Sequence, residues 1–176
     1  MRRNDIKPAL IAIVGGLAMC AALAMPLGGC RRQPAGPAAA TTSSGAQVAI
    51  AGRGVWTVEL AVTAERRSKG LAGRDSLAAG HGMLFVFSGP VVRDFWMEGC
   101  HIPLDIAFIS PDMRVVKTYR MAVEADRKGH VLYSSQAPAQ YALEMPAGEL
   151  DRAGVRAGDS VSLTGIPEAV KAQADP

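Results

Sequence analysis

The chain has 176 residues, with 19 Lys and Arg against 16 Asp and Glu, and a formal net charge of +3. Residues 1–29 hold three of the basic residues and one acidic residue, so the remainder carries 16 basic and 15 acidic residues, a net charge of +1. No block of basic residues with interleaved aromatic residues follows, and this balance argues against a nucleic-acid partner.

Residues 1–29 have the order of segments typical of a bacterial lipoprotein signal peptide. Three basic residues lie before a nearly unbroken apolar run at 9–25, and small residues then lead into Cys30. We therefore expect cleavage before Cys30 and a lipid on this cysteine. The lipid would be the protein's membrane partner and would place the exported protein on the periplasmic side of the cell envelope.

Two other interpretations of the leader remain open. Residues 8–27 are about long enough to cross a bilayer as an uncleaved anchor, although Gly and Pro residues interrupt them. Residues 22–24 (ALA) have the form that precedes cleavage of an ordinary secretory signal. The two glycines directly before Cys30 favour lipidation over both alternatives.

After the leader, the chain divides into a tether, one domain and a short tail. Residues 30–46 are rich in Pro, Gly, Ala, Ser and Thr and lack apolar periodicity, which predicts a flexible tether. Residues 47–166 are long enough for one domain, and residues 167–176 are expected to form a frayed tail. Of three cysteines only Cys100 lies in the domain, which excludes an intrachain disulfide framework.

The first half of the domain is predicted to be mainly β. Residues 48–51 and 55–62 flank a Gly-Arg-Gly turn, and residues 55–62 alternate between apolar and polar side chains. Thr63 is a suitable N-cap for a short helix through residue 69. Residues 83–87 (MLFVF) have the length of a buried strand, and residues 91–97 predict another strand after a Ser-Gly-Pro turn.

The second half continues this pattern. Residues 104–109 and 114–120 bracket a Ser-Pro-Asp turn. Weaker strand signals lie at 132–134 and 141–145, a single helical turn is expected at 150–153, and the last strand at 160–163. About eight short strands predict a single compact antiparallel β sandwich or irregular barrel with one or two short helices.

Residues 95–105 bring together most of the side chains that could carry chemistry. The thiol of Cys100 could be a nucleophile, but in an extended chain the side chain of His101 points to the opposite face. An activating partner would have to come from elsewhere, such as His81 or His130. A small buried cysteine beside a loop histidine is the commoner arrangement, and it is the interpretation that we favour.

Asp105 and Glu144 each lie in an otherwise apolar strand. An inward-facing carboxylate must be hydrogen-bonded or paired, and Arg74 and Arg93 are possible partners of Asp105. If the two carboxylates converge, they could form a general acid and base. Such groups more often accept backbone N–H bonds or face solvent, so a structural role is favoured.

No metal site or cofactor is expected, because the sequence contains no local spacing that arranges metal ligands and no nucleotide-binding loop. Trp96 beside Phe95 could line a ligand cleft, but with few aromatic residues in the chain an anchoring role in the core is favoured. The side chains expected to contact a partner or ligand are Trp96, Glu98, His101 and Asp105.

Three collinear segments carry a family resemblance: GMLFVF at 82–87, FWM at 95–97 and IPLDIAFI at 102–109. Further matches follow at 66–71, 74–77, 141–148 and 154–161. Together these segments closely resemble the domain of unknown function 192, over roughly residues 55–163. The resemblance implies a compact β-rich domain, often exported, and it implies no established activity.

The chain departs from the family pattern at residues 98–100. It has Glu-Gly-Cys where many relatives resemble Lys-Asn-Thr or Lys-Asn-Cys. The resemblance therefore implies neither a positive charge at Glu98 nor a shared mechanism based on Cys100.

The leading functional hypothesis is a lipoprotein that binds an envelope protein or a small ligand without catalysis. The alternative is a hydrolase that uses Cys100 or the carboxylate pair of Asp105 and Glu144. A structural envelope protein with no small-molecule site is a third hypothesis. The sequence contains none of the common catalytic fingerprints, which favours the first hypothesis.

Overall fold

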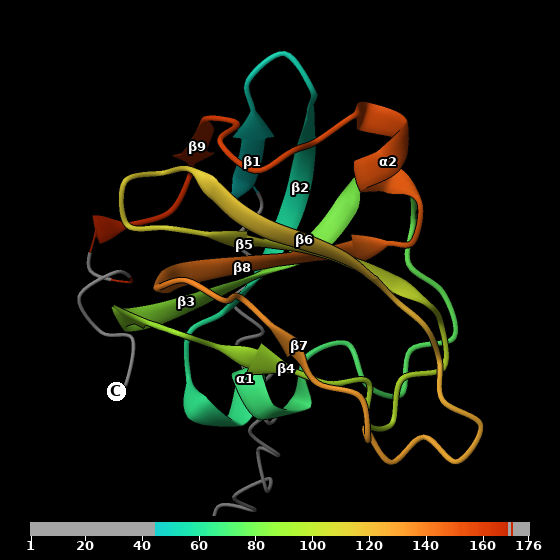
Figure 1. Cartoon of the computed structure of the whole chain (residues 1–176). Coiled ribbons are helices and arrows are strands. Elements are labelled where there is room, and N and C mark those ends of the chain that lie inside the picture. Colours follow the sequence, from blue (N-terminus) through green and yellow to red (C-terminus); the bar gives the residue numbers. More distant parts are fainter. Residues whose placement is uncertain (1–44, 169, 171–176) are drawn as a thin grey trace, which may run out of the picture. The chain divides into compact units, whose positions relative to one another are not determined.

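Figure 1 shows the computed structural model of the chain, which describes residues 45–168 and 170. These residues belong to one compact unit. The predicted signal peptide, Cys30 and nearly all of the predicted tether lie outside the described residues, as does most of the predicted tail. Among the described helices, none has the length and apolar character needed to cross a membrane.

The described residues form nine strands and two short helices, which confirms the prediction of a mostly β domain. In chain order these are β1 (Gln47–Ile50), β2 (Gly54–Ala61), α1 (Ala64–Lys69), β3 (His81–Val91), β4 (Asp94–Phe95), β5 (Leu104–Ile109), β6 (Val115–Met121), β7 (Tyr133–Ser134), β8 (Ala139–Pro146), α2 (Glu149–Ala153) and β9 (Val161–Thr164). Seven strands form one sheet in the order β6-β5-β8-β3-β2-β1-β9, and β4 pairs with β7 in a small second sheet.

One strand pair departs from the antiparallel prediction, because β2 and β3 run parallel. A parallel pair needs a long crossover, and here the crossover contains α1. This helix begins as predicted: the Thr63 side chain accepts a hydrogen bond from the backbone N–H of Arg66 at 3.2 Å, and Gly70 caps the other end. The crossover places α1 beside the sheet, where it becomes one wall of the pocket described below (Figure 1).

The seven-stranded sheet curls until its two edge strands meet at one end. Arg114 and Ser160, which lie just outside β6 and β9, form an isolated bridge. Backbone hydrogen bonds from Val115 to Asp159 and from Val161 to Met113 strengthen this contact, at 3.0 and 2.9 Å. The result is a curled half-barrel, consistent with the predicted irregular barrel.

Side chains alternate between the two faces of the sheet and so form two apolar cores. One core includes Val115 near one edge and Val161 at the other, so it lies within the curl. The other core includes Phe85, Phe108 and Met97 and lies on the outer face. The outer core is covered by α1 and by the segments around β4 and β7. The cavity described below lies between α1, the segment around β4 and the sheet.

Residues 91–97 do not form the continuous strand that their apolar pattern predicts. Instead β3 continues through the predicted turn to Val91, with a shift of register against β8 between Val86 and Val91. A bulge of this kind accommodates glycine and proline, which a regular ladder does not. Only Asp94–Phe95 of the following segment is a strand, so this segment leaves the main sheet and lies over the outer core.

Candidate ligand pocket

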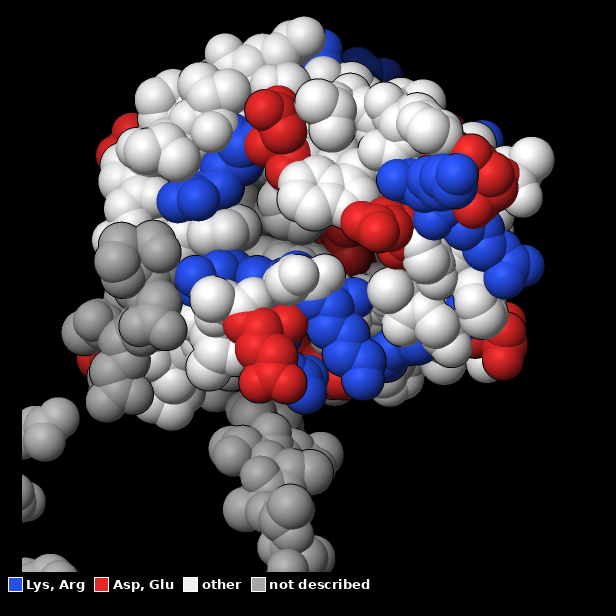
Figure 2. Space-filling model, turned by 90° about the horizontal axis from the view of Figure 1, so that it is seen from below, with Lys and Arg blue, Asp and Glu red and all other residues white. Residues whose placement is uncertain are grey.

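A cavity of about 610 Å³ lies over the outer face of the sheet. Phe85 and Phe87 from β3 and Glu144 from β8 contribute buried side chains to it. Residues 67–72, at the end of α1, line one side, and residues 92–96 with 98–100 line the other. Figure 2 views the molecule from this side and shows a hollowed face with basic side chains along its edges. The volume lies within the range of about 300–1,000 Å³ that is typical of small-molecule sites.

Aromatic contacts hold the segment after β3 above the sheet. The ring of Phe95 packs edge-to-face on Phe85 and Phe108, with centroids 5.0 and 5.5 Å apart. The next residue, Trp96, is 46% exposed, and its Nε1 donates a hydrogen bond to Glu98 Oε2 at 3.3 Å. The favoured core role of Trp96 is therefore wrong, because its ring lies at the surface. Trp96 and Glu98, two of the contact residues suggested by the sequence, line the pocket.

Glu144 is a buried acid group without a hydrogen-bond partner among the described residues. On β8 it lies opposite Met83 and Ile106, it is only 5% exposed, and it lines the cavity. Burial raises the pKa of its carboxyl to about 8, so this group keeps its proton at neutral pH. A protonated carboxyl offers both an O–H donor and an acceptor. Because buried polar groups are normally hydrogen-bonded, Glu144 is suited to meet a ligand or a water molecule in the cavity.

Cys100 lines the same cavity, but its environment does not favour a nucleophile. The residue is 6% exposed, and its thiol forms no disulfide. Burial, followed by the charge of Glu144, raises the pKa of the thiol to about 11. The thiolate is the reactive form of cysteine, and at neutral pH almost none of it is present here. The pocket therefore presents a neutral thiol and a neutral carboxyl to any occupant.

Two arginines lie at the ring of Phe87. The guanidinium carbon of Arg93 lies 3.6 Å from the ring centre, and that of Arg67 lies 5.2 Å away. Arg93 donates hydrogen bonds to the carbonyl oxygens of Ala139 and Gly89, at 3.3 and 2.7 Å. Burial, and then the charge of Arg67, lower the pKa of Arg93, so the two cations are close enough to affect each other.

None of the three histidines forms a hydrogen bond with Cys100 in the described structure. His101 Nδ1 contacts Asp75 Oδ1 at 2.7 Å, His81 faces a backbone oxygen, and His130 contacts Asp126. His101 does not line the cavity, unlike the neighbouring thiol. The structure thus does not bring together the imidazole and thiol that a cysteine hydrolase would need.

The second pair proposed for a hydrolase, Asp105 and Glu144, does not converge either. In the pairing of β5 with β8, Asp105 lies opposite Met145, while Ile106 lies opposite Glu144. Because neighbouring residues of a strand point to opposite faces, the two carboxyl groups lie on opposite sides of the sheet. The described structure therefore does not bring these two carboxyl groups together as a general acid and base.

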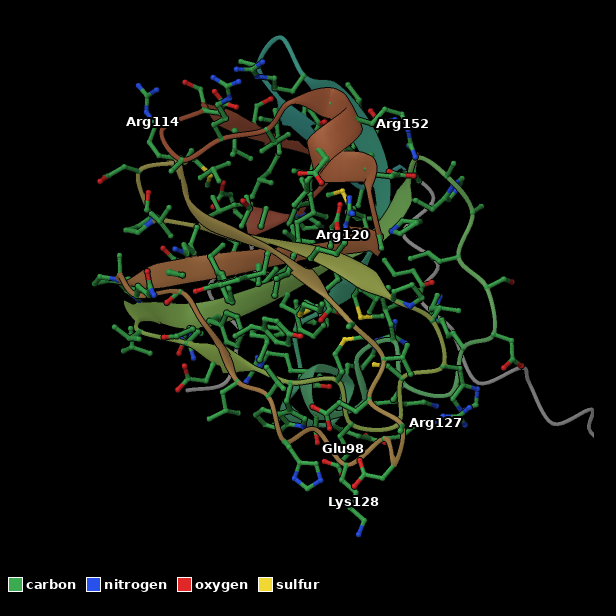
Figure 3. All side chains as sticks on the ribbon, turned by 45° about the vertical axis from the view of Figure 1, so that its right-hand side comes forward. Glu98, Arg114, Arg120, Arg127, Lys128 and Arg152 are labelled. Carbon is green, nitrogen blue, oxygen red and sulfur yellow. The ribbon has the colours of Figure 1, made fainter. Side chains whose placement is uncertain are left out.

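Asp105 instead supports the start of α2. Its Oδ2 accepts hydrogen bonds from the backbone N–H groups of Gly148 and Leu150, at 2.8 and 2.9 Å. Its Oδ1 lies 3.6 Å from Arg120 Nε, so the ion-pair partner is Arg120. Figure 3 shows Arg120 on β6, close to α2.

The two arginines expected to pair with Asp105 are engaged elsewhere. Arg74 forms an ion pair with Glu59 at 2.6 Å, and Arg93 lies at the pocket. Proximity along the chain does not identify the partner, because Arg120 is brought to Asp105 by the pairing of β5 with β6.

A group of possible metal ligands lies on a surface loop, and none of the three side chains lines the cavity. Ligand atoms of Glu124, Asp126 and His130 are all within 4.8 Å of one another. Each of these side chains already forms a hydrogen bond within the loop: Glu124 with two backbone N–H groups, and Asp126 with the His130 ring. These bonds account for the grouping as a loop brace, so it carries no metal assignment.

Part of this site has no signal in the sequence. The sequence assigns no role to Arg67 or Lys69, it indicates a place in the core for Phe87, and it suggests Arg93 only as a partner of Asp105. These residues come from α1, β3 and the segment before β4, so only the fold brings them together. A basic residue at the end of an apolar strand has no local feature that would distinguish it from an ordinary surface residue.

Two solved structures are similar to this chain. One, from Sinorhizobium meliloti 1021 and described only provisionally as a transcription regulator, is 35% identical, with a TM-score of 0.62, over 69% of this chain and 94% of its own. The other, a protein of unknown function from Novosphingobium aromaticivorans DSM 12444, is 33% identical, with a TM-score of 0.58, over 67% of this chain and 83% of its own. The first shows that a chain consisting almost entirely of this domain folds.

No curated protein matches the chain. The pattern of the DUF192 family, described as uncharacterized ACR, matches residues 46–163, which include β1 to β8, all but the last residue of β9, both helices and every residue of the pocket. The chain therefore belongs to the DUF192 family.

Proposed function

We propose that this protein is a lipoprotein of the bacterial envelope whose β domain binds a small organic molecule in the pocket without catalysing a reaction on it. The observation that carries the binding function is Glu144, an acid group 5% exposed that lines a cavity of about 610 Å³ without a hydrogen-bond partner among the described residues. A bound molecule with a hydroxyl or carbonyl group would satisfy this acid.

The chemistry of Cys100 supports binding over catalysis. A thiol with a pKa of about 11 is protonated at neutral pH, and no histidine in the described structure forms a hydrogen bond with it. Thiol hydrolases lower the pKa of their cysteine, the opposite of the shift found here. The phenylalanines of the cavity favour a ligand with an apolar body.

A neutral apolar probe provides the first test. We expect N-phenyl-1-naphthylamine to bind to residues 31–176 and the Ala72→Trp variant to bind it at least about tenfold more weakly, because an indole at residue 72 would occupy the cavity. The dissociation constants are measured by fluorescence titration. The matched control is Ala125→Trp, which adds the same side chain at an exposed position outside the pocket.

The comparison of these two tryptophan variants decides the result. Both variants must melt cooperatively, which shows that they are folded; Ser68→Trp replaces Ala72→Trp if the latter does not. Equal affinity in the two variants would mean that the probe binds outside the pocket. That result, or no binding to the parent chain, would refute the proposed binding function.

The proposed membrane anchor has its own test. In full-length protein produced in bacteria, we expect metabolic labelling with a fatty-acid analogue to mark the parent chain and to disappear in Cys30→Ala, because the thiol of Cys30 is the predicted acyl acceptor. The control is Cys20→Ala, which removes a cysteine within the apolar segment and should keep the label. An unchanged label in Cys30→Ala would exclude lipidation at this residue.

A further inference from the structure

Arg93 is held firmly at the pocket, yet part of its guanidinium group has no partner. Its Nε and Nη2 donate hydrogen bonds to backbone carbonyl oxygens, and its guanidinium carbon lies 3.6 Å from the centre of the Phe87 ring. Among the described residues, its Nη1 has no hydrogen-bond acceptor, and no carboxylate forms an ion pair with the group. A cation that is fixed in position and only partly hydrogen-bonded is well prepared to bind an anion.

A second cation reinforces this end of the cavity. Arg67 lies at the same Phe87 ring and donates hydrogen bonds to the carbonyl oxygens of Val62 and Val86, at 2.6 and 3.2 Å. Burial, and then the charge of Arg67, lower the pKa of Arg93, so the two guanidinium groups act on the same end of the cavity. A cleft with low-dielectric walls strengthens the potential of such charges.

The other charged groups of the cavity do not cancel this potential. Lys69 lines the same wall as Arg67 and adds a third cation. Two exposed acids also line the cavity, Asp94 and Glu98, and Glu98 is bonded to Trp96 at the rim. Glu144 is protonated at neutral pH and contributes no charge. The lining thus has three cations against two anions, with the arginine pair at Phe87.

We infer that the ligand is a small organic anion whose acidic group binds at Arg93 and Arg67 and whose apolar body lies against the phenylalanines of the cavity floor. This inference rests on the proposed binding function and specifies the class of ligand. Sulfonates, carboxylates and phosphates share the required charge and oxygen acceptors. Neutral molecules of the same shape fill the apolar part of the cavity but leave Arg93 unpaired.

Two probes with the same ring system distinguish the contribution of the acidic group to binding from that of the apolar body. 8-Anilino-1-naphthalenesulfonate carries a sulfonate that N-phenyl-1-naphthylamine lacks. At pH 7 and low salt, we expect the sulfonate to bind residues 31–176 about tenfold more tightly than the neutral compound, and Arg93→Gln to remove this advantage. The affinity for the neutral compound should change less than twofold in the same variant. Added sodium chloride should weaken the binding of the sulfonate only.

Two further variants test whether the preference for the sulfonate depends on the charge at residue 93 or on the overall charge of the protein. Arg127→Gln removes one positive charge from an exposed loop residue outside the cavity, and it should leave both affinities unchanged (Figure 3). Arg93→Lys keeps the charge and should retain part of the preference for the sulfonate. If Arg93→Gln does not melt cooperatively, Arg93→Met replaces it, because methionine also lacks the charge and should also remove the preference.

The possible failures are distinguishable. If the neutral probe binds in the pocket but the sulfonate binds no more tightly, or if its preference survives in Arg93→Gln, the anion inference is wrong and the binding function stands. If Arg127→Gln weakens the sulfonate as much as Arg93→Gln does, the preference reflects overall charge and the inference is also overturned. If neither probe binds, the binding function itself fails.

Discussion

Glu144→Gln is expected to stabilise the domain at pH 8.5 by roughly 3–5 kcal/mol, and to have little effect at pH 5. In the folded protein the pKa of Glu144 is about 8, whereas an ordinary glutamate, as in the unfolded chain, has a pKa of 4.5. Between these values the unfolded chain loses a proton that the folded domain keeps. The free energy of unfolding therefore falls as pH rises from about 4.5, and the loss is complete above about 8.

Glutamine removes this dependence because its amide is neutral at every pH. Urea unfolding of residues 31–176 at pH 5, 6, 7, 8 and 8.5 measures the difference between the two proteins. Other titrating groups contribute equally to both and cancel in this difference. Glu98→Gln is the control, since Glu98 is exposed and lines the same cavity. If the two unfolding curves differed by the same amount at every pH, Glu144 would be an ordinary ionised carboxylate and the account of the pocket floor would be wrong.

Cys100 is expected to react with iodoacetamide about 100-fold more slowly at pH 8 than an unperturbed thiol of pKa 9. The pKa of about 11 leaves about one thiol in a thousand ionised at this pH, compared with about one in ten for the reference. Burial reduces access further. The rate should rise about tenfold per pH unit between 8 and 10, without a plateau.

Intact-mass measurements on residues 31–176 follow this reaction directly, because Cys100 is the sole cysteine of that fragment. A short peptide with one unperturbed cysteine, alkylated in the same tube, is the reference. Glu144→Gln should speed the reaction several-fold above pH 8, since the charge of Glu144 raises the pKa of the thiol. A rate close to that of the peptide at pH 8 would restore the cysteine nucleophile and count against a purely binding pocket.

Local patterns were sufficient to predict much of the fold. The turn at Gly52-Arg53-Gly54 joins β1 to β2, Thr63 caps α1, and the Ser-Pro-Asp turn lies between β5 and β6, as expected. These features depend on short-range backbone preferences, which the sequence displays directly. The parallel pairing of β2 with β3 depends instead on which distant strands meet, and residues 91–97 were misjudged because a bulge leaves no apolar signature.

In the site, too, the unusual residues are visible in the sequence, whereas their roles depend on strand pairing. Asp105 and Glu144 are both carboxylates within apolar strands, and both were recognised as unusual. Their roles differ only because the register of β5 against β8 directs them to opposite faces: Asp105 finds the N–H groups of α2, while Glu144 faces the cavity. Periodicity cannot decide between these outcomes, since it does not reveal what packs over each face.

Carbon-13 NMR of the Glu144 side-chain carboxyl shows whether a molecule binds in the pocket at this residue. In glutamate-labelled residues 31–176, the Glu144 signal is identified by its absence in Glu144→Gln. We predict that this signal titrates with a pKa near 8 in the free protein. We also predict that it shifts on addition of 8-anilino-1-naphthalenesulfonate, with the same saturation curve as the fluorescence. A probe that saturates the fluorescence while the Glu144 signal stays unchanged would show that the molecule does not bind at Glu144.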